Sequence, residues 1–516
     1  MKSVIPNVLP SPADSGSYSG AHMRSRIKWL VWSVALILVG MSYGVESRST
    51  ATMMVMVGLF GLSLISAWQA QFDLAHPAVW FGIPFTLYAV ITPIFYLLDI
   101  YHYYENYGPD FDIHFVLVVE FIALASFLVA IPGQPRWLAD SFWNDRWGTL
   151  SPHIVRGSFP LLLGASFLAL IHLSMLWISG FQSKIDIIAS DQPWLRISFA
   201  FHLMAVGAAA YILGCRRLSP RFPWRSMVAF AVFLALSVMV AGERGVLFRY
   251  LLVVVVMWHL CYRKLKIHHL VFGFAIALYA AEILGYFKVY FLSRDFVGIE
   301  FGDSIEDVFV MMFGGEMRTA SENLAVVTSH IPNSIPYQGL DPVFMDLRRV
   351  VLPGFLLPRG LYPSTVDWFN MTFFTKLYDS GGGVGFTLVG FAYLCYGIPF
   401  VILFFVSLGL GVRLLYTRAS TSSVYVLCYA NAIPLLIYSI RSDLATILSQ
   451  GAKHILLPIG LMWVIGRLRG RKLLNVDERG TSGRLSDSVD CPEGSLPCEP
   501  SIPGPKSESR DLEPLG

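Results

Sequence analysis

The chain has 516 residues, of which 55% are hydrophobic, 14% are aromatic and only 14% are charged. Ordinary soluble domains carry about 25% charged residues, so the composition excludes a solvated globular enzyme and a long disordered polymer. The net charge of +3 is too small to indicate nucleic acid as a partner. These numbers indicate a polytopic membrane protein.

Long apolar runs occupy much of the chain between residues 27 and 466. A transmembrane helix needs about 20 mostly apolar residues. By this criterion we expect about twelve spans, at residues 27–45, 51–68, 78–98, 112–132, 158–179, 197–215, 226–241, 246–262, 269–292, 384–412, 423–440 and 444–466. The predicted fold is therefore all-α: a polytopic integral membrane protein with about 12 transmembrane helices and one large outer (periplasmic) loop.

The lysines and arginines that flank these runs indicate the orientation of the chain. If the N-terminus is cytoplasmic, the inner flanks are rich in Lys and Arg, whereas the opposite short loops hold Arg48, Lys184, Arg196, Arg244 and Arg441. Cytoplasmic loops of membrane proteins carry the excess of positive charge. We therefore expect both termini to be cytoplasmic.

This orientation divides the chain into five parts. Residues 1–23 form a cytoplasmic N-terminal segment, 24–292 a membrane bundle of about nine spans, 293–383 the large outer loop and 384–466 about three further spans. The tail, 467–516, is rich in Ser, Pro, Gly and Glu from about residue 473, and we expect it to be disordered in the cytoplasm. No Cys or His spacing typical of a metal site is present, so we expect neither a metal nor a cofactor.

Two short outer turns each carry an arginine beside a carboxylate. The first is Gly-Glu-Arg-Gly at 242–245, with Glu243 and Arg244, and the second precedes the last span, with Arg441 and Asp443. Glycine lets backbone N–H groups approach an anion closely, and a guanidinium binds phosphate in a bidentate manner. The alternatives are that Arg244 reaches the lipid headgroups and that Arg441 pairs with Asp443.

The outer loop adds further charged candidates. Most of its charged residues would lie on a solvated surface, and those we consider for substrate binding are Arg294, Arg318, Arg349 and Arg359. Candidates for a general base on this side are Glu243, Glu316, His330 and Asp443, because each is a carboxylate or an imidazole. Polar residues within spans are costly and often functional; here they are Glu120, Arg249, Glu282, Lys288, Lys453 and His454. Lys453 and His454 either line a cavity or pair with Glu282 or Glu120.

The order of these features resembles the O-antigen polymerases of the Wzy-dependent pathway. The resemblance consists of the many spans, the Gly-x-Arg-Gly outer turn, the long outer loop, the Pro-Arg-Gly-Leu-Tyr-Pro stretch at 358–363, the glycine-rich run that ends at Gly397 and the final outer arginine, Arg441. In motif terms it covers roughly residues 226–466.

The resemblance implies a metal-independent membrane glycosyltransferase of the bacterial inner membrane. Such an enzyme joins undecaprenyl-diphosphate-linked oligosaccharide repeat units into a surface polysaccharide, which is an O-antigen, a capsule or an exopolysaccharide. Its partners would be that lipid-linked oligosaccharide, membrane lipids, a chain-length regulator and a flippase. Arg244 and Arg441 would stabilise the charge that develops on the leaving diphosphate.

Two alternatives remain open from the residues. An O-antigen ligase would share the topology, the lipid-diphosphate donor and the outer arginines. A flippase or transporter of lipid-linked oligosaccharides would need a charged central cavity and short loops on both sides, whereas the charge here is concentrated in one large outer loop. The sequence therefore favours the polymerase.

Overall fold

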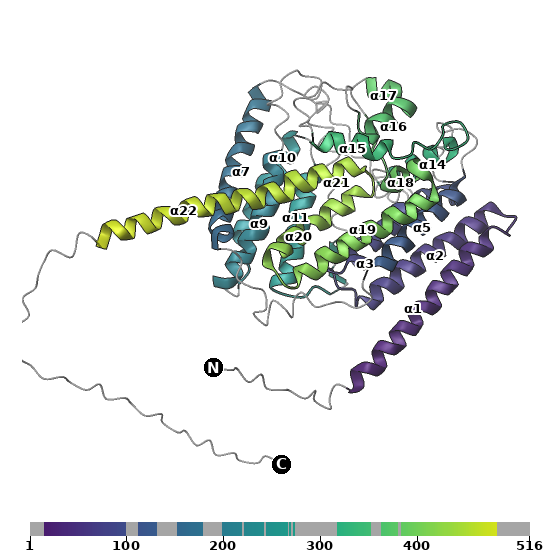
Figure 1. The fold of residues 1–516 in the computed structure, drawn as a ribbon, viewed down its shortest axis with the longest axis horizontal. Coiled ribbons are helices and arrows are strands. Elements are labelled where there is room, and N and C mark those ends of the chain that lie inside the picture. Colours follow the sequence, from purple (N-terminus) through teal and green to yellow (C-terminus); the bar gives the residue numbers. More distant parts are fainter. Residues whose placement is uncertain are drawn as a thin grey trace, which may run out of the picture. The chain divides into compact units, whose positions relative to one another are not determined.

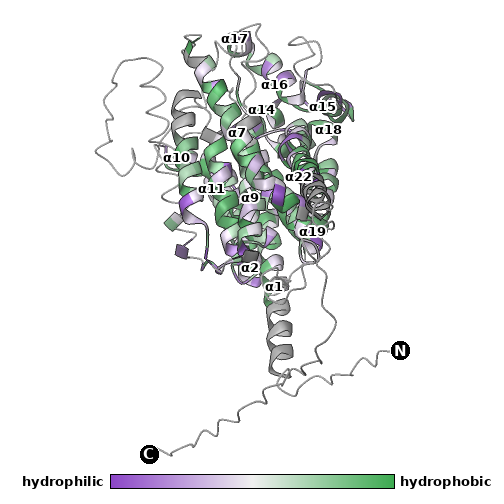
Figure 2. Cartoon of the chain, turned by 90° about the vertical axis from the view of Figure 1, so that its left-hand side faces the viewer, coloured by the Kyte–Doolittle hydropathy of each residue, from purple (hydrophilic) through white to green (hydrophobic). Residues whose placement is uncertain are grey.

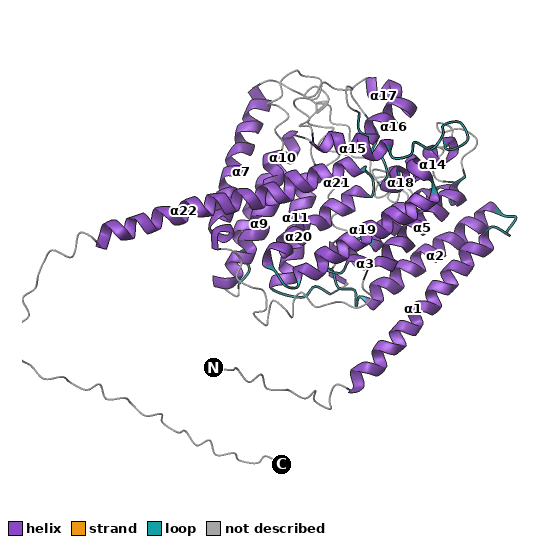
Figure 3. Cartoon of the chain, viewed as in Figure 1, coloured by secondary structure: helices purple, strands orange, loops and turns teal. Residues whose placement is uncertain are grey.

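The computed structural model describes residues 15–99, 112–131, 152–178, 199–218, 221–241, 244–266, 268–269, 272–273, 317–351, 363–379 and 383–481. Every regular element in these ranges is a helix, as Figure 3 shows, which confirms the all-α prediction for this part of the chain. The predicted span 269–292 and the segment 293–316 lie almost entirely outside the described residues. The chain forms two compact units, 1–467 and 468–516, and the contacts discussed below lie within the first.

Six helical segments are long and apolar enough to cross a membrane, judged by length and composition: Arg48–Gln69, Pro77–Leu97, Ile113–Ala130, His153–Met175, Ile398–Ala419 and Leu444–Arg469. Shorter apolar helices cover Trp29–Ser42, Leu203–Arg216, Trp224–Ala235, Gly245–Cys261 and Ser423–Ser439. Figure 2 shows hydrophobic residues along the helices of the bundle. These segments define a helical membrane protein.

The N-terminal part of the bundle comprises α1 (Ser15–Ser42), α2 (Arg48–Gln69), α3 (Pro77–Trp80), α4 (Gly82–Leu97) and α5 (Ile113–Ala130). Polar side chains define several of the helix starts. Ser47 accepts from the N–H of Thr50 at the start of α2, and Asp112 accepts from the N–H of Phe115 at the start of α5. α2 packs against α1, α4 and α5.

The middle of the bundle comprises α7 (Pro152–Ile178), α9 (Phe199–Leu218), α10 (Trp224–Ala241) and α11 (Arg244–Cys261). α9 packs between α7 and α11. Its inward face is lined with small side chains, among them Ala205, Ala208 and Ala209, all of which are buried. Small residues let membrane helices approach each other closely.

The described part of the predicted outer loop contains α14 (Thr319–His330), α15 (Asp341–Val351), α16 (Thr365–Phe373) and α17 (Thr375–Asp379). α15, α16 and α17 lie at the upper end of the bundle in Figure 1. α14 instead packs among α4, α5 and α18 (Leu388–Tyr396). Part of the segment predicted as a loop therefore belongs to the packed bundle.

The C-terminal part comprises α19 (Ile398–Ala419), α20 (Ser423–Ser439), α21 (Leu444–Gly451), the π-helix η4 (Ala452–Leu456) and α22 (Leu457–Thr481). The prediction of a single span at 384–412 was wrong, because Gly397, at φ +67°, separates α18 from α19. Residues 384–387 precede α18 as extended chain, and Thr387 caps that helix. Glycine adopts this left-handed conformation without the strain that a side chain would introduce.

Two further differences concern α19 and α22. Gly409 lets α19 lie directly on α5, because a Cβ atom at this position would be 2.7 Å from the carbonyl oxygen of Phe127. α22 continues to Thr481, beyond the predicted end of the last span at 466. Arg, Lys, Leu and Glu predominate just after that point and are good helix formers.

Candidate functional site

Asp346 of α15 joins the outer segment to the turn after α20. Its Oδ1 atom accepts hydrogen bonds from the backbone N–H and the hydroxyl of Thr365, both at 2.8 Å. Its Oδ2 atom accepts from the backbone N–H of Ala445 at 2.9 Å. A single carboxylate therefore satisfies N-terminal N–H groups of two helices, α16 and α21.

Asp443 makes the reciprocal connection. It caps its own helix, α21, by accepting from the N–H of Thr446 at 2.9 Å and from the Thr446 hydroxyl at 2.6 Å. Its other oxygen accepts from the N–H of Val366 in α16, at 3.3 Å. We call Asp346 and Asp443 the carboxylate clasp. Asp443, a predicted base, is thus engaged in holding α16 to α21.

Burial changes how the carboxylate clasp binds protons. Both side chains are buried. Burial, and then the charge of Asp443, raises the pKa of Asp346 to about 7. Burial also raises the pKa of Asp443, against hydrogen bonds from Thr446 and Val366 that lower it. The clasp therefore retains a proton at a pH at which an exposed aspartate is ionised.

We expect the stability of the protein to fall as the pH rises from about 4 to about 7. The folded pKa of Asp346 lies above its unfolded value of about 3.9, so its proton favours folding fully below that value, and this contribution is lost progressively until the pH reaches the folded pKa of about 7. The melting temperature of the purified protein should therefore decrease between about pH 4.5 and 7 and level off above that, and Asp346→Asn should flatten the slope. An unchanged slope in this variant would assign the titration to another group.

The turn that carries Arg441 packs on residues 384–388. The N–H of Leu388 donates to the Ile440 carbonyl at 3.3 Å. At Gly385 a Cβ atom would lie 3.0 Å from the Arg441 carbonyl oxygen. The Arg441 guanidinium lies over the ring of Tyr438, 4.9 Å from its centre, in a cation–π contact. This arginine is therefore held two residues before Asp443 of the carboxylate clasp.

Polar side chains dock α14 into the bundle. Pro93 of α4 has no N–H, which leaves the Ala89 carbonyl without its helical donor. The Ser321 hydroxyl lies 3.1 Å from that carbonyl oxygen and 2.8 Å from Oε1 of Glu120. A hydroxyl has one hydrogen, so Ser321 donates to one of these acceptors at a time, and Glu120 is the nearer of the two. α14 is also tied to the Arg441 turn, because Asn323 donates to the Gly385 carbonyl.

An ion pair lies within α14. Nε of Arg318 is 2.8 Å from Oε1 of Glu322, at an i,i+4 spacing, and both side chains are largely buried. Burial raises the pKa of Glu322 to about 7, against the charge of Arg318, which lowers it. Arg318, predicted to bind substrate, thus has a carboxylate partner inside the protein.

His330 ends α14 with a defined tautomer. Its Nδ1 atom lies 2.9 Å from the Val326 carbonyl oxygen, and a carbonyl only accepts, so Nδ1 carries the proton. The ring packs against Phe373 at 4.9 Å between centres. In the neutral imidazole, Nε2 therefore holds the lone pair that could accept a proton.

A group of basic residues surrounds η4. Arg249 of α11 donates to Nδ1 of His454 and to the side-chain oxygen of Gln450. Arg349 of α15 lies near Lys453, and their positive charges repel each other. We call Arg249, Arg349, Lys453 and His454 the basic cluster. His454, predicted either to line a cavity or to pair with Glu282 or Glu120, bonds to an arginine, and Glu282 lies outside the described residues.

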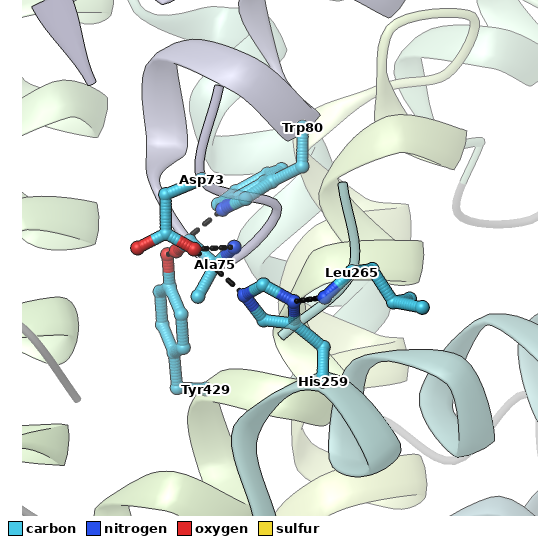
Figure 4. A network of polar contacts seen from close by, with 6 residues as sticks. All are labelled: Asp73, Ala75, Trp80, His259, Leu265 and Tyr429. Carbon is cyan, nitrogen blue, oxygen red and sulfur yellow. Dashed lines mark hydrogen bonds and ion pairs between the residues drawn. The ribbon is translucent and has the colours of Figure 1, made fainter. Parts of the chain in front are cut away.

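A separate network joins chain segments that the predicted topology places on the cytoplasmic side (Figure 4). The N–H of Leu265 donates to Nδ1 of His259 at 2.9 Å, so the imidazole proton is on Nε2. That group donates to Asp73 at 2.7 Å, and the N–H of Ala75 donates to the same oxygen at 3.1 Å. Burial alone would raise the pKa of Asp73, but the hydrogen bonds from His259 and Ala75 lower it below its usual value.

Tyr429 of α20 completes this network. Its hydroxyl donates to the Ala75 carbonyl and accepts from Nε1 of Trp80 at 2.8 Å. Asp73, His259 and Tyr429 are buried, and each has partners within the protein. We therefore interpret this network as a structural connection between α3, α11 and α20.

The predicted site residues fall into two groups. Arg441, Asp443, His330, Arg318 and Arg349 are described, and they lie on α14, on α15 and in the turn before α21. Arg244 begins α11, and its side chain lies outside what the structure describes, as do Glu243, Arg294, Glu316 and Arg359. Sequence analysis missed Asp346 and Glu322. The i,i+4 spacing of Arg318 and Glu322 was a visible signal, although it does not reveal burial.

The arrangement can hold anions through arginine and lysine, and it offers an oriented imidazole for proton transfer. Within the described ranges, no group of three or more His, Cys, Asp and Glu side chains is placed to hold a metal ion. The class of protein defined here is a helical membrane protein with charged clusters among its apolar helices. Comparison with known proteins adds no relative: no family model, curated protein or solved structure matches the chain.

Proposed function

We propose that this protein polymerises undecaprenyl-diphosphate-linked oligosaccharide repeat units at the periplasmic face of a bacterial inner membrane. The observation that carries the proposal is the connection of the polar segment around α14–α16 to the Arg441 turn through Asp346, Asp443 and Gly385. Such a connection gathers arginines and a histidine at one end of a membrane bundle. The motif resemblance at residues 226–466 supplies the reaction class.

The topology in this proposal has about twelve spans, a large periplasmic loop and two cytoplasmic termini. The contacts support it, because they join segments that the alternation of spans assigns to the same side. Asp73, His259 and Tyr429 meet near predicted cytoplasmic ends. Asp346 and Asp443 meet partners near predicted periplasmic ends.

In the proposed reaction the bond between the anomeric carbon and the diphosphate of the growing chain breaks, and a hydroxyl of the next repeat unit forms a bond to that carbon. Arg244 and Arg441 would stabilise the leaving diphosphate, at about 2.7–4 kcal/mol for each preorganised donor by analogy with oxyanion holes. Among the predicted bases, His330 is the best supported, because its Nδ1 proton is held by a carbonyl and Nε2 can accept the hydroxyl proton.

The polysaccharide ladder of a deletion strain tests the proposed function. Loss of the polymerase should leave a band with one repeat unit on the lipid A core. Free lipid-linked polymer would instead indicate a lost ligase, and cytoplasmic accumulation of lipid-linked units a lost flippase. An unchanged ladder would refute the proposal.

Replacement of His330 by Ala is expected to reduce polymerisation about 10²–10⁴-fold while the protein remains abundant, because a general base contributes a factor of that size. Incorporation of labelled repeat units in membrane vesicles would measure it. His330→Asn keeps an N–H donor near the position of Nδ1 but cannot accept a proton, so it should be as inactive as Ala. Normal activity in either variant would exclude His330 as the base.

Reporter fusions test the topology. Fusions near Gly339 should be active outside the cytoplasm, and fusions near Lys266 and after Lys472 inside it, because of the Lys/Arg distribution. A cytoplasmic signal at Gly339 would invert the orientation and move the proposed site away from the periplasm.

A further inference from the structure

The basic cluster lies where the last bundle helix changes its geometry. α21 gives way to the π-helix η4 at Ala452, directly before Lys453 and His454. Single π-turns within α-helices occur frequently at functional sites. Gln450, near the end of α21, and His454, in η4, both bond to the guanidinium of Arg249 on α11. Because a guanidinium has donors only, His454 accepts at Nδ1 and is neutral.

Two more cations, Arg349 and Lys453, belong to the basic cluster. α15 packs on α21, and Arg349 near its end lies close to Lys453. Among the residues that the structure describes, no carboxylate forms an ion pair with Arg349 or Lys453. Asp346, one helical turn before Arg349, is occupied by the backbone N–H groups of Thr365 and Ala445. The positive charges of Arg349 and Lys453 are therefore available to bind an anionic ligand.

The surroundings of the basic cluster are apolar and exposed. Lys453 is exposed, and so are its neighbours Leu456 (64%) and Leu457 (46%). In α15, Phe344 is 51% exposed beside the exposed Arg348. Exposed apolar residues next to basic ones are typical of helices that lie at a membrane interface. The cluster therefore opens toward lipid rather than toward an aqueous pocket.

In the proposed topology the cluster lies in the outer half of the membrane. Arg249 follows the start of α11 by five residues, and Lys453 follows the start of α21 by nine. At 1.5 Å per residue these positions are roughly 8 and 14 Å from the helix starts, which is less than half of a hydrocarbon core of about 30 Å. α21 begins at the carboxylate clasp, and the predicted topology places the start of α11 on the same side.

We propose that Arg249, Arg349 and Lys453 bind the diphosphate of a polyprenyl-linked saccharide whose chain lies against the exposed leucines of η4 and α22. This site is additional to the turn arginines, Arg244 and Arg441, and its ligand rests on the proposed function. The number of cations favours this ligand, because a doubly charged diphosphate neutralises more of the cluster than the single phosphodiester of a phospholipid. A polymerase must hold two lipid diphosphates at once, one on the donor and one on the acceptor, which calls for a second anion site.

Binding of undecaprenyl diphosphate to the purified full-length protein in lipid nanodiscs tests the proposal, with native mass spectrometry as the measurement. Arg349→Gln and Lys453→Gln should each weaken binding about tenfold or more, since each removes a charged hydrogen-bond donor. Arg348→Gln is the matched control: it lies on the same helix, one residue away and exposed, and it should bind within about twofold of wild type. Arg349→Lys, which keeps the charge, should bind better than Arg349→Gln and shows that loss of binding is not loss of folding.

Three probes separate the sources of the phosphate. Undecaprenol, which lacks phosphate, should bind at least tenfold more weakly than undecaprenyl diphosphate, and excess phosphatidylglycerol should not displace the diphosphate. Equal binding of undecaprenol, displacement by phosphatidylglycerol, or equal effects of Arg348→Gln and Arg349→Gln would each overturn the proposal. The assay requires no polymerisation, so a failed lipid site with a single-repeat ladder in the deletion strain would leave the proposed function standing. An unchanged ladder with normal lipid binding would refute the function alone.

Discussion

Replacement of Arg441 by Ala is expected to abolish long polymer while the protein remains at normal abundance in the membrane. The reason is that the proposed reaction develops negative charge on a diphosphate at the end of the bundle where Arg441 lies. The turn is held by hydrogen bonds that do not involve the Arg441 guanidinium, such as the one from the N–H of Leu388 to the Ile440 carbonyl. Truncation of the side chain should therefore leave the fold intact. The surface-polysaccharide ladder and a membrane immunoblot measure the two effects.

Arg418 provides a matched control. It also makes a cation–π contact with a tyrosine of α20, Tyr425 at 5.9 Å, but at the opposite end of that helix. Arg418→Ala should therefore give a normal ladder. Arg441→Lys keeps the charge but loses the planar fork of the guanidinium, so partial activity is expected. The same series at Arg244 should behave alike. A wild-type ladder from Arg441→Ala would remove this residue from the mechanism.

The largest effect on stability is expected for Asp73→Ala. It would leave the Nε2–H of His259 and the N–H of Ala75 buried without their acceptor. Each such donor costs about 1–3 kcal/mol, so we expect a loss of about 2–6 kcal/mol. Thermal unfolding in detergent, with the monodisperse fraction in size-exclusion chromatography, would measure it.

Asp73→Asn retains one oxygen that can accept from His259, so its loss should be smaller than that of Ala. Glu46→Ala removes an exposed carboxylate from the loop before α2, at the opposite end of that helix, and should change stability by less than about 0.5 kcal/mol. If Asp73→Ala unfolds at the same temperature as wild type, the network in Figure 4 contributes little to the fold. The effect of Asp73→Ala on activity would then be the measurement that tests the network.

The sequence was most informative about the apolar helices. The run predicted at 51–68 corresponds to α2 at Arg48–Gln69, and that at 112–132 to α5 at Ile113–Ala130. Length and composition suffice for such segments, because a lipid environment demands a continuous apolar stretch with internal hydrogen bonds. The break at Gly397 was also visible as a glycine followed two residues later by a proline, but it lay inside a run that was apolar throughout.

Only the tertiary structure decided which polar residues meet. Asp346 bonds to Ala445, 99 residues further along the chain, and Arg249 meets His454 at a separation of 205 residues. Helix periodicity cannot predict such partners in this protein, because apolar residues surround a helix such as α5 and only single polar residues such as Glu120 indicate an inward side. Apolar length alone determines that a helix crosses the membrane. Its rotation and its neighbours are determined by packing of small residues and by a few buried polar groups, whose hydrogen bonds form only after the helices come together.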